Sequence, residues 1–216
     1  MATSITPVWT STGVLTAPKC LARGSTIRAT LDLRAKFGAK IFVGIGRGGT
    51  TALTAPGVYF ICRAMPGDGT VGRILAPFAQ MNTSNPASGA AANLINNGAG
   101  YVAGTTAFTV DGAGTPAVDD WYCFWGVTAI PADGTALTTC EFVRVAKYAA
   151  NVLTADAPSL FAHADNELLY SRADCGVFDL PGGVMYEFVW DYVAHAAGES
   201  AAVAAWYSTY DSNSAT

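Results

Sequence analysis

Three glycines, Gly44, Gly46 and Gly49, form the pattern G-x-G-x-x-G directly after a segment typical of a β-strand. In dinucleotide-binding proteins this pattern works because a helix follows it and the helix N-terminus holds the pyrophosphate. Here the chain continues as TTALTAPG, and the Pro-Gly pair at 56–57 would end any helix within about two turns. A phosphate-binding loop is also excluded, because Thr50 stands where that motif requires a lysine. We therefore predict a glycine-rich strand end and turn.

The run Gly198-Glu-Ser200-Ala-Ala202 is close to the G-x-S-x-G nucleophile elbow, with Ala202 in place of the last glycine. In hydrolases with this elbow the serine is followed by an acid and then by a histidine. Asp211 follows Ser200 here, but no histidine does. We predict that this run is a turn between two C-terminal strands.

The chain has two histidines, His163 and His195, and neither has a second histidine or a cysteine at the spacing of metal ligands. His163 and Asp165 have the residue types of half an acid–base pair. Their surroundings, ADAPSLFAHADNE, are typical of a loop rather than of a catalytic strand end. A structural loop is therefore favoured at this position.

Three aspartates, Asp119, Asp120 and Asp133, are of the right type to bind calcium, but the loop D-x-[DN]-x-[DN]-G is absent. The chain has four glutamates, and nothing in their spacing marks a pair. Paired carboxylates for sugar hydrolysis meet only in the fold, so the sequence leaves that chemistry open. We predict no catalytic residue, no cofactor-binding residue, no metal ligand and no cofactor.

Five cysteines are present, an odd number, and no two of them form a C-x-x-C pair. The start of the chain has neither the basic nor the apolar region of an export signal, so we expect reduced thiols. Two of the five, Cys62 and Cys123, lie in apolar runs and are expected to be small buried residues. The cysteines are Cys20, Cys62, Cys123, Cys140 and Cys175.

Aromatic residues crowd two segments of the chain. One face of such a strand is expected to enter the core, and the other face is expected to form an exposed surface for proteins or sugars. The sequence does not decide which rings lie on which face. They are Trp121, Tyr122, Phe124 and Trp125 in the first segment, and Trp206, Tyr207 and Tyr210 in the second.

Charged residues make up only 13% of the chain, about half of the usual share of roughly 25%. Hydrophobic residues make up 51%, which excludes intrinsic disorder. Twelve basic and 16 acidic residues give a net charge of −4, which argues against nucleic acid as the main partner. The densest basic run, at 34–40, is expected to be a solvated turn. A surface with so few charges indicates a protein that is bound to other proteins.

The charge deficit is concentrated in residues 74–110, a stretch of 37 residues without one charged side chain. Its prolines, asparagines and glycines would leave polar groups unsatisfied in lipid, so we expect no membrane span. We predict connecting chain here, and we expect that residues 1–20 and this stretch become ordered on a partner.

Alternation of apolar and polar residues with a period of two dominates the rest of the chain. Between the first two predicted strands, residues 32–39 are expected to make one or two helical turns that Gly38 ends as a left-handed cap. Turns are predicted at 111–112, 131–134, 149–150 and 181–183. The predicted strands are residues 26–33, 39–44, 58–63, 105–110, 120–128, 138–148, 151–154, 168–172, 184–193 and 202–210.

Many short strands without a long helical period predict an all-β protein. We expect a jelly-roll-like β-sandwich built from residues 1–82 and 175–216. A small β-barrel-like module at 101–174 would be inserted into it, after an uncharged connecting segment at 83–100.

Several runs resemble small virion proteins of tailed bacteriophages. The first is TLDLRAKFGAKIFVGIGRGGTTALTAPGVYFICR from Thr30, where the family pattern opens a β-sandwich. The others are TTAFTVDG at 105–112, at the start of an inserted module, and GGVMYEF at 182–188, in a closing strand pair. The resemblance covers most of the chain, consists of structural motifs and carries over no catalytic residue.

The resemblance implies a non-enzymatic structural protein of the virion. We expect a head decoration, or cement, protein on the capsid surface, assembled in the host cytoplasm, that stabilises contacts between capsomers. Its expected partners are the major capsid protein and its own copies, as a homotrimer, with no nucleic acid and no membrane. The alternative is a tail or fibre component that binds host-surface glycans. A third hypothesis, a hydrolase using Ser200 and His163, has little support.

Overall fold

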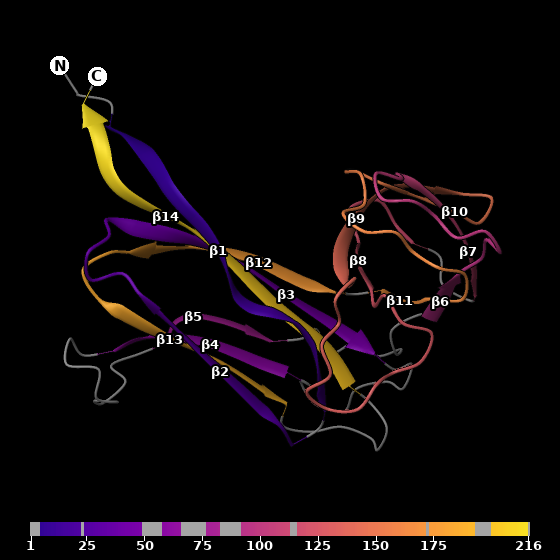
Figure 1. The fold of residues 1–216 in the computed structure, drawn as a ribbon, viewed down its shortest axis with the longest axis horizontal. Coiled ribbons are helices and arrows are strands. Elements are labelled where there is room, and N and C mark those ends of the chain that lie inside the picture. Colours follow the sequence, from indigo (N-terminus) through magenta and orange to yellow (C-terminus); the bar gives the residue numbers. More distant parts are fainter. Residues whose placement is uncertain are drawn as a thin grey trace.

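The structure is a computed structural model, and it describes residues 5–22, 24–48, 58–65, 77–82, 92–112, 116–171, 173–192 and 200–215. Within these residues the chain forms two four-stranded antiparallel sheets and one closed six-stranded barrel, without a helix (Figure 1). The prediction of an all-β sandwich with a small barrel-like module is confirmed. None of the described residues belongs to a helix that could cross a membrane.

The first sheet has the strand order β1-β14-β3-β12. Its central strand β14 pairs with β1 along nearly its whole length, but with β3 only from Ser200 to Tyr210. The two strands therefore run on together past Tyr210 as a ribbon that projects from the sandwich in Figure 1. The bounds are β1 (Ile5–Ala22), β3 (Gly38–Gly48), β12 (Asp174–Pro181) and β14 (Ser200–Ala215).

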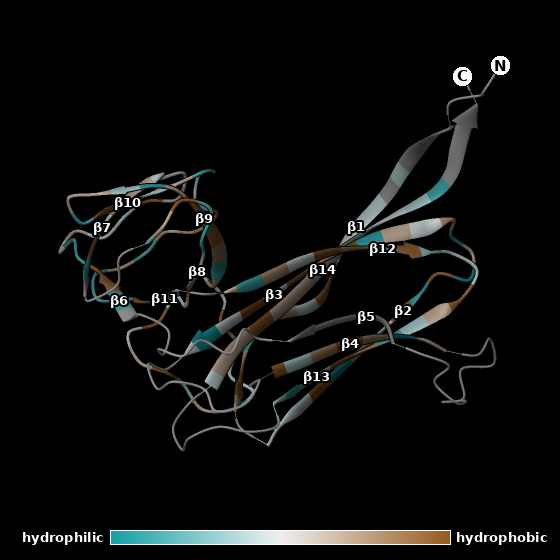
Figure 2. Ribbon diagram, turned by 180° about the vertical axis from the view of Figure 1, so that it is seen from behind, coloured by the Kyte–Doolittle hydropathy of each residue, from teal (hydrophilic) through white to brown (hydrophobic). Residues whose placement is uncertain are grey.

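The second sheet has the order β2-β13-β4-β5 and faces the first across a common core. Alternation along β13 puts Tyr186, Phe188, Trp190 and Tyr192 inside, each at most 2% exposed, as the sequence predicts. Figure 2 shows hydrophobic and hydrophilic residues alternating along the sandwich strands. The bounds are β2 (Thr26–Asp32), β4 (Val58–Met65), β5 (Pro77–Asn82) and β13 (Met185–Tyr192).

The barrel closes in the order β10-β7-β6-β11-β8-β9 around its own apolar core, with Phe108, Phe124 and Leu153 fully buried in it. The turn between β9 and β10 has Ala150 and Asn151 at positive φ, the geometry of a tight hairpin, where a turn is predicted. The bounds are β6 (Ala92–Ile95), β7 (Ala107–Gly112), β8 (Trp121–Phe124), β9 (Glu141–Ala149), β10 (Val152–Ala155) and β11 (Leu168–Ser171).

Two expectations about unstructured chain differ from the structure. Residues 1–20 were expected to become ordered only on a partner protein. Most of them instead form strand β1, because β14 of the same chain supplies an antiparallel neighbour. Parts of the uncharged stretch are strands β5, β6 and β7, so the predicted connecting segment at 83–100 includes a barrel strand. Ile95 of β6 is fully buried, but the adjacent pair Leu94-Ile95 among asparagines shows no alternation from which a strand could be predicted. Residues 83–91 lie outside the described residues.

The predicted helical turn at 32–39 is also wrong. Residues 34–37 form a turn and bend, and Gly38 begins β3 instead of capping a helix. The backbone there is fixed by tertiary contacts, since the Phe37 amide donates to the Tyr210 carbonyl at 2.9 Å and the Gly182 amide donates to the Phe37 carbonyl at 2.8 Å. The local sequence DLRAKFG does not reveal those partners, which lie far away along the chain.

Candidate functional site

The glycines of β3 are the surface on which the barrel rests. Alternate residues Gly44, Gly46 and Gly48 share the face of the first sheet that points away from the sandwich core. A Cβ at Gly44 would overlap the Phe142 ring, and one at Gly46 would overlap Cys123. These glycines therefore let the barrel approach the sheet backbone directly, a packing role that the sequence pattern did not reveal. Gly49 lies outside the described residues.

Between the sheet and the barrel is a third apolar core, which we call the junction core. It joins residues from β1, β8, β14 and the loop before β9, so the two modules share buried surface. Its buried members are Cys20, Cys123, Trp125, Leu137, Cys140, Tyr170, Ala173 and Ala202.

The thiols behave as small apolar side chains there. All five cysteines are free, and the Sγ atoms of Cys123 and Cys140 lie 3.7 Å apart in the junction core. Burial raises the pKa of the Cys123 thiol well above its ordinary value. In the sandwich core, burial also raises the pKa of Cys62 to about 12. These thiols are therefore poor nucleophiles at neutral pH.

A loop of the barrel module follows the edge of β1. The Cys20 amide donates to the Thr135 carbonyl and the Gly134 amide donates to the Cys20 carbonyl, both at 2.9 Å. The Asp133 carboxylate accepts from the Ala22 amide at 2.7 Å and from the Ser25 hydroxyl at 2.6 Å. Asp133, a calcium candidate by residue type, thus fastens the two modules together.

Replacing Asp133 with asparagine is expected to lower the free energy of unfolding by about 1 kcal/mol, because a charged acceptor of two hydrogen bonds is lost. The bonds from Ser25 and Ala22 hold the Asp133 pKa below its ordinary value of 3.8. Its stabilisation is therefore present above that pH and is lost as the pH falls through the lower folded pKa. Urea unfolding at neutral and acidic pH measures both effects. Asp111→Asn, an exposed carboxylate on β7, should change neither.

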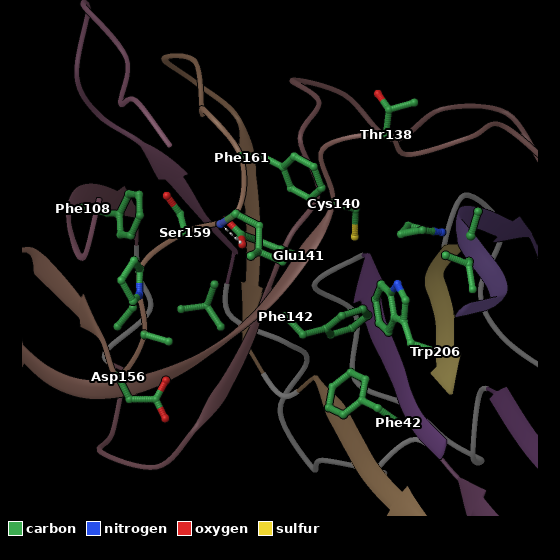
Figure 3. Close-up of a pocket in the computed structure, with 18 residues that line it drawn as sticks. Phe42, Phe108, Thr138, Cys140, Glu141, Phe142, Asp156, Ser159, Phe161 and Trp206 are labelled. Atoms are coloured by element: carbon green, nitrogen blue, oxygen red, sulfur yellow. Dashed lines mark hydrogen bonds between the residues drawn. The ribbon is translucent and has the colours of Figure 1, made fainter. Parts of the chain in front are cut away.

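An open cleft of about 640 Å³ lies where the barrel leaves the sheet (Figure 3). Strands β1, β3 and β14 form its sandwich side, and β9 with the loop after β10 forms its barrel side. Of the 18 lining residues only Glu141 and Asp156 are ionisable acids, and none is basic. The sandwich side consists of Val14, Ala17, Pro18, Phe42 and Trp206, and the barrel side includes Cys140, Glu141, Phe142, Asp156, Ser159, Leu160 and Phe161.

Three half-buried rings meet at the floor of this cleft. The ring centroids of Phe42 and Trp206 are 5.6 Å apart, and Phe142 lies 6.5 Å from each of them. We call these three residues the aromatic floor. Trp121 lies 6.3 Å from Phe42 but does not line the cleft.

The structure thus decides between core and surface for the aromatic residues named from the sequence. Tyr122, Phe124 and Trp125 are buried, whereas Trp121 and Trp206 are half-exposed, and Trp206 belongs to the aromatic floor. Tyr207 is partly buried and packs against the sandwich core. The Tyr210 ring makes an edge-on contact with the exposed Trp9, with 5.3 Å between the ring centroids.

Behind the barrel side of the cleft lies a buried ionic network that the sequence did not reveal. His163 Nε2 is 2.6 Å from Glu141 Oε1, and His163 Nδ1 is 2.7 Å from Glu167 Oε2. All three residues are at most 7% exposed. Burial lowers the pKa of His163, but the hydrogen bonds to Glu141 and Glu167 outweigh it and raise the pKa to about 9. The imidazole is therefore protonated at neutral pH.

The network also holds the wall of the cleft. The Leu160 amide donates to Glu141 Oε2 at 2.8 Å, and the Ala164 amide donates to Glu167 Oε1 at 2.9 Å. Both ring nitrogens and all four carboxylate oxygens therefore have partners, so the arrangement fixes a loop rather than presenting a base to substrate.

The pairing of His163 with Asp165 is not observed: Asp165 accepts from the Asn97 amide at 2.8 Å. Asp119 pairs with Arg144 at 2.7 Å, and Asp120 accepts from the Ala117 amide at 3.0 Å. Among the described residues no group of three or more His, Cys, Asp or Glu could hold a metal ion.

The nucleophile-elbow candidate lies in a strand. Ser200 is 6% exposed and begins β14 opposite Gly48, so the predicted turn does not include it. His195, Gly198 and the rest of 193–199 lie outside the described residues.

We compared the chain with protein-family models, with curated proteins and with solved structures, and none of these comparisons found a match.

Proposed function

We propose that this protein is a non-enzymatic structural protein of a virion, a head decoration protein that binds assembled capsid and stabilises contacts between capsomers. One observation carries the proposal. A broad and mostly apolar surface lies over the outer face of the first sheet, with Lys40, Thr12 and Ser208 as polar residues in its lining, on a body whose two modules share a buried core.

A second hollow of about 890 Å³ on this surface is lined from β1, β3, β12 and β14, and it adjoins the cleft because Val14, Phe42 and Trp206 line both. Trp9 and Val177 line the second hollow and are 49% and 58% exposed. Contiguous exposed apolar area of this kind marks surfaces that meet other proteins. A protein that staples capsomers needs wide contact area on a stiff body, and this surface supplies it.

The proposal predicts a loss of capsid binding when the surface is charged. Val14→Arg is expected to weaken co-sedimentation with assembled capsid by at least about tenfold, because a long charged side chain on the apolar contact surface would have to lose its water when the partner binds. Val14 is 57% exposed, so the folded state should tolerate the change. Val118→Arg, at a barrel valine that is 61% exposed and lines neither hollow, is the matched control and should bind normally.

Two results contradict the proposal. One is wild-type protein that stays in the supernatant with capsids of its own virus. The other is purified virions in which this polypeptide cannot be detected.

The alternative, a tail or fibre component that binds glycans, is favoured by the half-exposed Trp121 and Trp206. Sugar sites combine such rings with several free hydrogen-bonding side chains. The cleft lining offers the hydroxyls of Thr138 and Ser159, and Ser159 is only 6% exposed. Immunogold labelling of the tail tip instead of the head would select this alternative.

A further inference from the structure

The cleft has two chemically different ends. Trp206 and Phe42 belong to its sandwich side, whereas Asp156 belongs to its barrel side, in the loop after β10 (Figure 3). Asp156 is 44% exposed, and its nearest cation, Arg144, stands 3.9 Å away. Arg144 lies closer to Asp119, at 2.7 Å, so the Asp156 carboxylate is only weakly paired.

The charges around the barrel end are unbalanced. Glu141, Glu167, Asp119 and Asp156 supply four carboxylates, and the cations in contact with them are His163 and Arg144. The cluster therefore carries a net charge of −2 even with the imidazole protonated. Among the described residues no lysine or arginine lines the cleft, so Glu141 and Asp156 direct a negative potential into it.

The apolar lining selects against small polar ligands. Leu160 stands at the barrel rim with 75% of its surface exposed, and Val14 stands at the sandwich rim. Between them the aromatic floor offers flat apolar area and few free hydrogen-bonding groups. An occupant must therefore bring apolar side chains to the floor and one cation to Asp156, a combination that a polypeptide provides and a glycan does not.

We infer that the cleft binds an extended segment of a partner protein, which rests apolar side chains on the aromatic floor and places an arginine at Asp156. Arginine fits better than lysine because its planar guanidinium pairs with a carboxylate through two hydrogen bonds. The inference rests on the proposed function in one respect, that the partner is a protein.

Calorimetric titration of the full chain with short blocked peptides tests this directly. The peptides alternate valine and threonine around a central arginine, norleucine or glutamate. The arginine peptide is expected to bind at least about tenfold more tightly than the norleucine peptide, and the glutamate peptide is expected to bind most weakly. Asp156→Asn should remove the preference for arginine and leave the affinity for norleucine unchanged.

Leu160→Ser measures the apolar contribution to binding separately, because it should lower the affinity for the arginine and norleucine peptides by the same factor. Val102→Ser is its matched control, since Val102 is also 75% exposed but lies outside the cleft. Asp111→Asn is the control for Asp156→Asn, and neither control should change binding.

Three results overturn the inference: no saturable binding of any peptide up to about 1 mM, equal affinity for arginine and norleucine, or equal affinity of the Leu160→Ser and Val102→Ser proteins. Capsid co-sedimentation is measured on the same variants. If no peptide binds while wild-type protein still binds capsid, this inference alone is overturned. Wild-type protein that does not bind capsid overturns the proposed function.

Discussion

Replacing His163 with glutamine is expected to lower the free energy of unfolding by about 3–5 kcal/mol, the usual effect of breaking a buried ion pair. Glu141 and Glu167 would be left facing each other without a cation, and both carboxylates are buried. Most of this loss of stability therefore comes from burying carboxylates without a cation, and less of it comes from losing two hydrogen bonds. Chemical denaturation, followed by fluorescence and by circular dichroism, measures it.

The same network gives stability a pH dependence. Burial lowers the His163 pKa, but the bonds to Glu141 and Glu167 raise it from 6.5 to about 9. A group whose folded pKa is raised binds its proton more tightly in the native state, so its stabilisation is complete below pH 6.5 and lost as the pH rises through about 9. We therefore expect the wild-type free energy of unfolding to fall across this range.

His163→Gln should abolish that slope. His195→Gln, at the second histidine of the chain, shows which imidazole the slope belongs to and should leave it in place. An unchanged slope in His163→Gln, or a loss of stability below about 1 kcal/mol, would show that the network does not hold a protonated imidazole.

Gly46→Ala is expected to destabilise the protein by about 1–3 kcal/mol, the usual effect of overpacking. The added Cβ would overlap both the Sγ and the Cβ of Cys123, and neither strand can move without parting the barrel from the sheet. In open space the same substitution stabilises by about 0.4–1 kcal/mol, because alanine restricts the unfolded chain. Gly98→Ala is the matched control, since no atom lies within 4 Å of its added Cβ. The two substitutions should change stability in opposite directions.

Thiol accessibility gives a second measurement of the same effect. Cys123 and Cys140 are at most 1% exposed in the junction core, so wild-type protein should react slowly with a thiol reagent. Gly46→Ala should speed their modification, and Gly98→Ala should not. Equal reactivity and equal stability of the two variants would falsify the role given to the β3 glycines.

Period-two alternation was enough to predict most of the strands, because one buried face leaves a direct mark on the sequence. In β13, for example, Tyr186, Phe188 and Trp190 alternate with partly polar residues, and their side chains form the sandwich core. The strands missed are β1, β5, β6 and β12. Strand β1 pairs with β14, and β12 pairs with β3. These partners lie far away along the chain, so no short window of the sequence contains both strands of a pair.

The candidate site shows the same division. The aromatic rings were visible as crowded segments, but only the fold shows that Phe42 of β3 and Phe142 of β9 meet beside Trp206. The glycines were visible too, as a pattern that resembles a nucleotide site. Their use, to bring the barrel against the sheet, depends on Cys123 and Phe142, which lie far along the chain.

By itself, then, the sequence determined the all-β class, the absence of a nucleotide-binding or elbow-type serine motif, and the poverty of charge, because each follows from local composition and short-range periodicity. Tertiary structure decided where the uncovered apolar surface lies and how Glu141 and Glu167 come to enclose His163. Those features depend on contacts between distant strands, and side chains that meet only after folding leave no periodic signal in the chain.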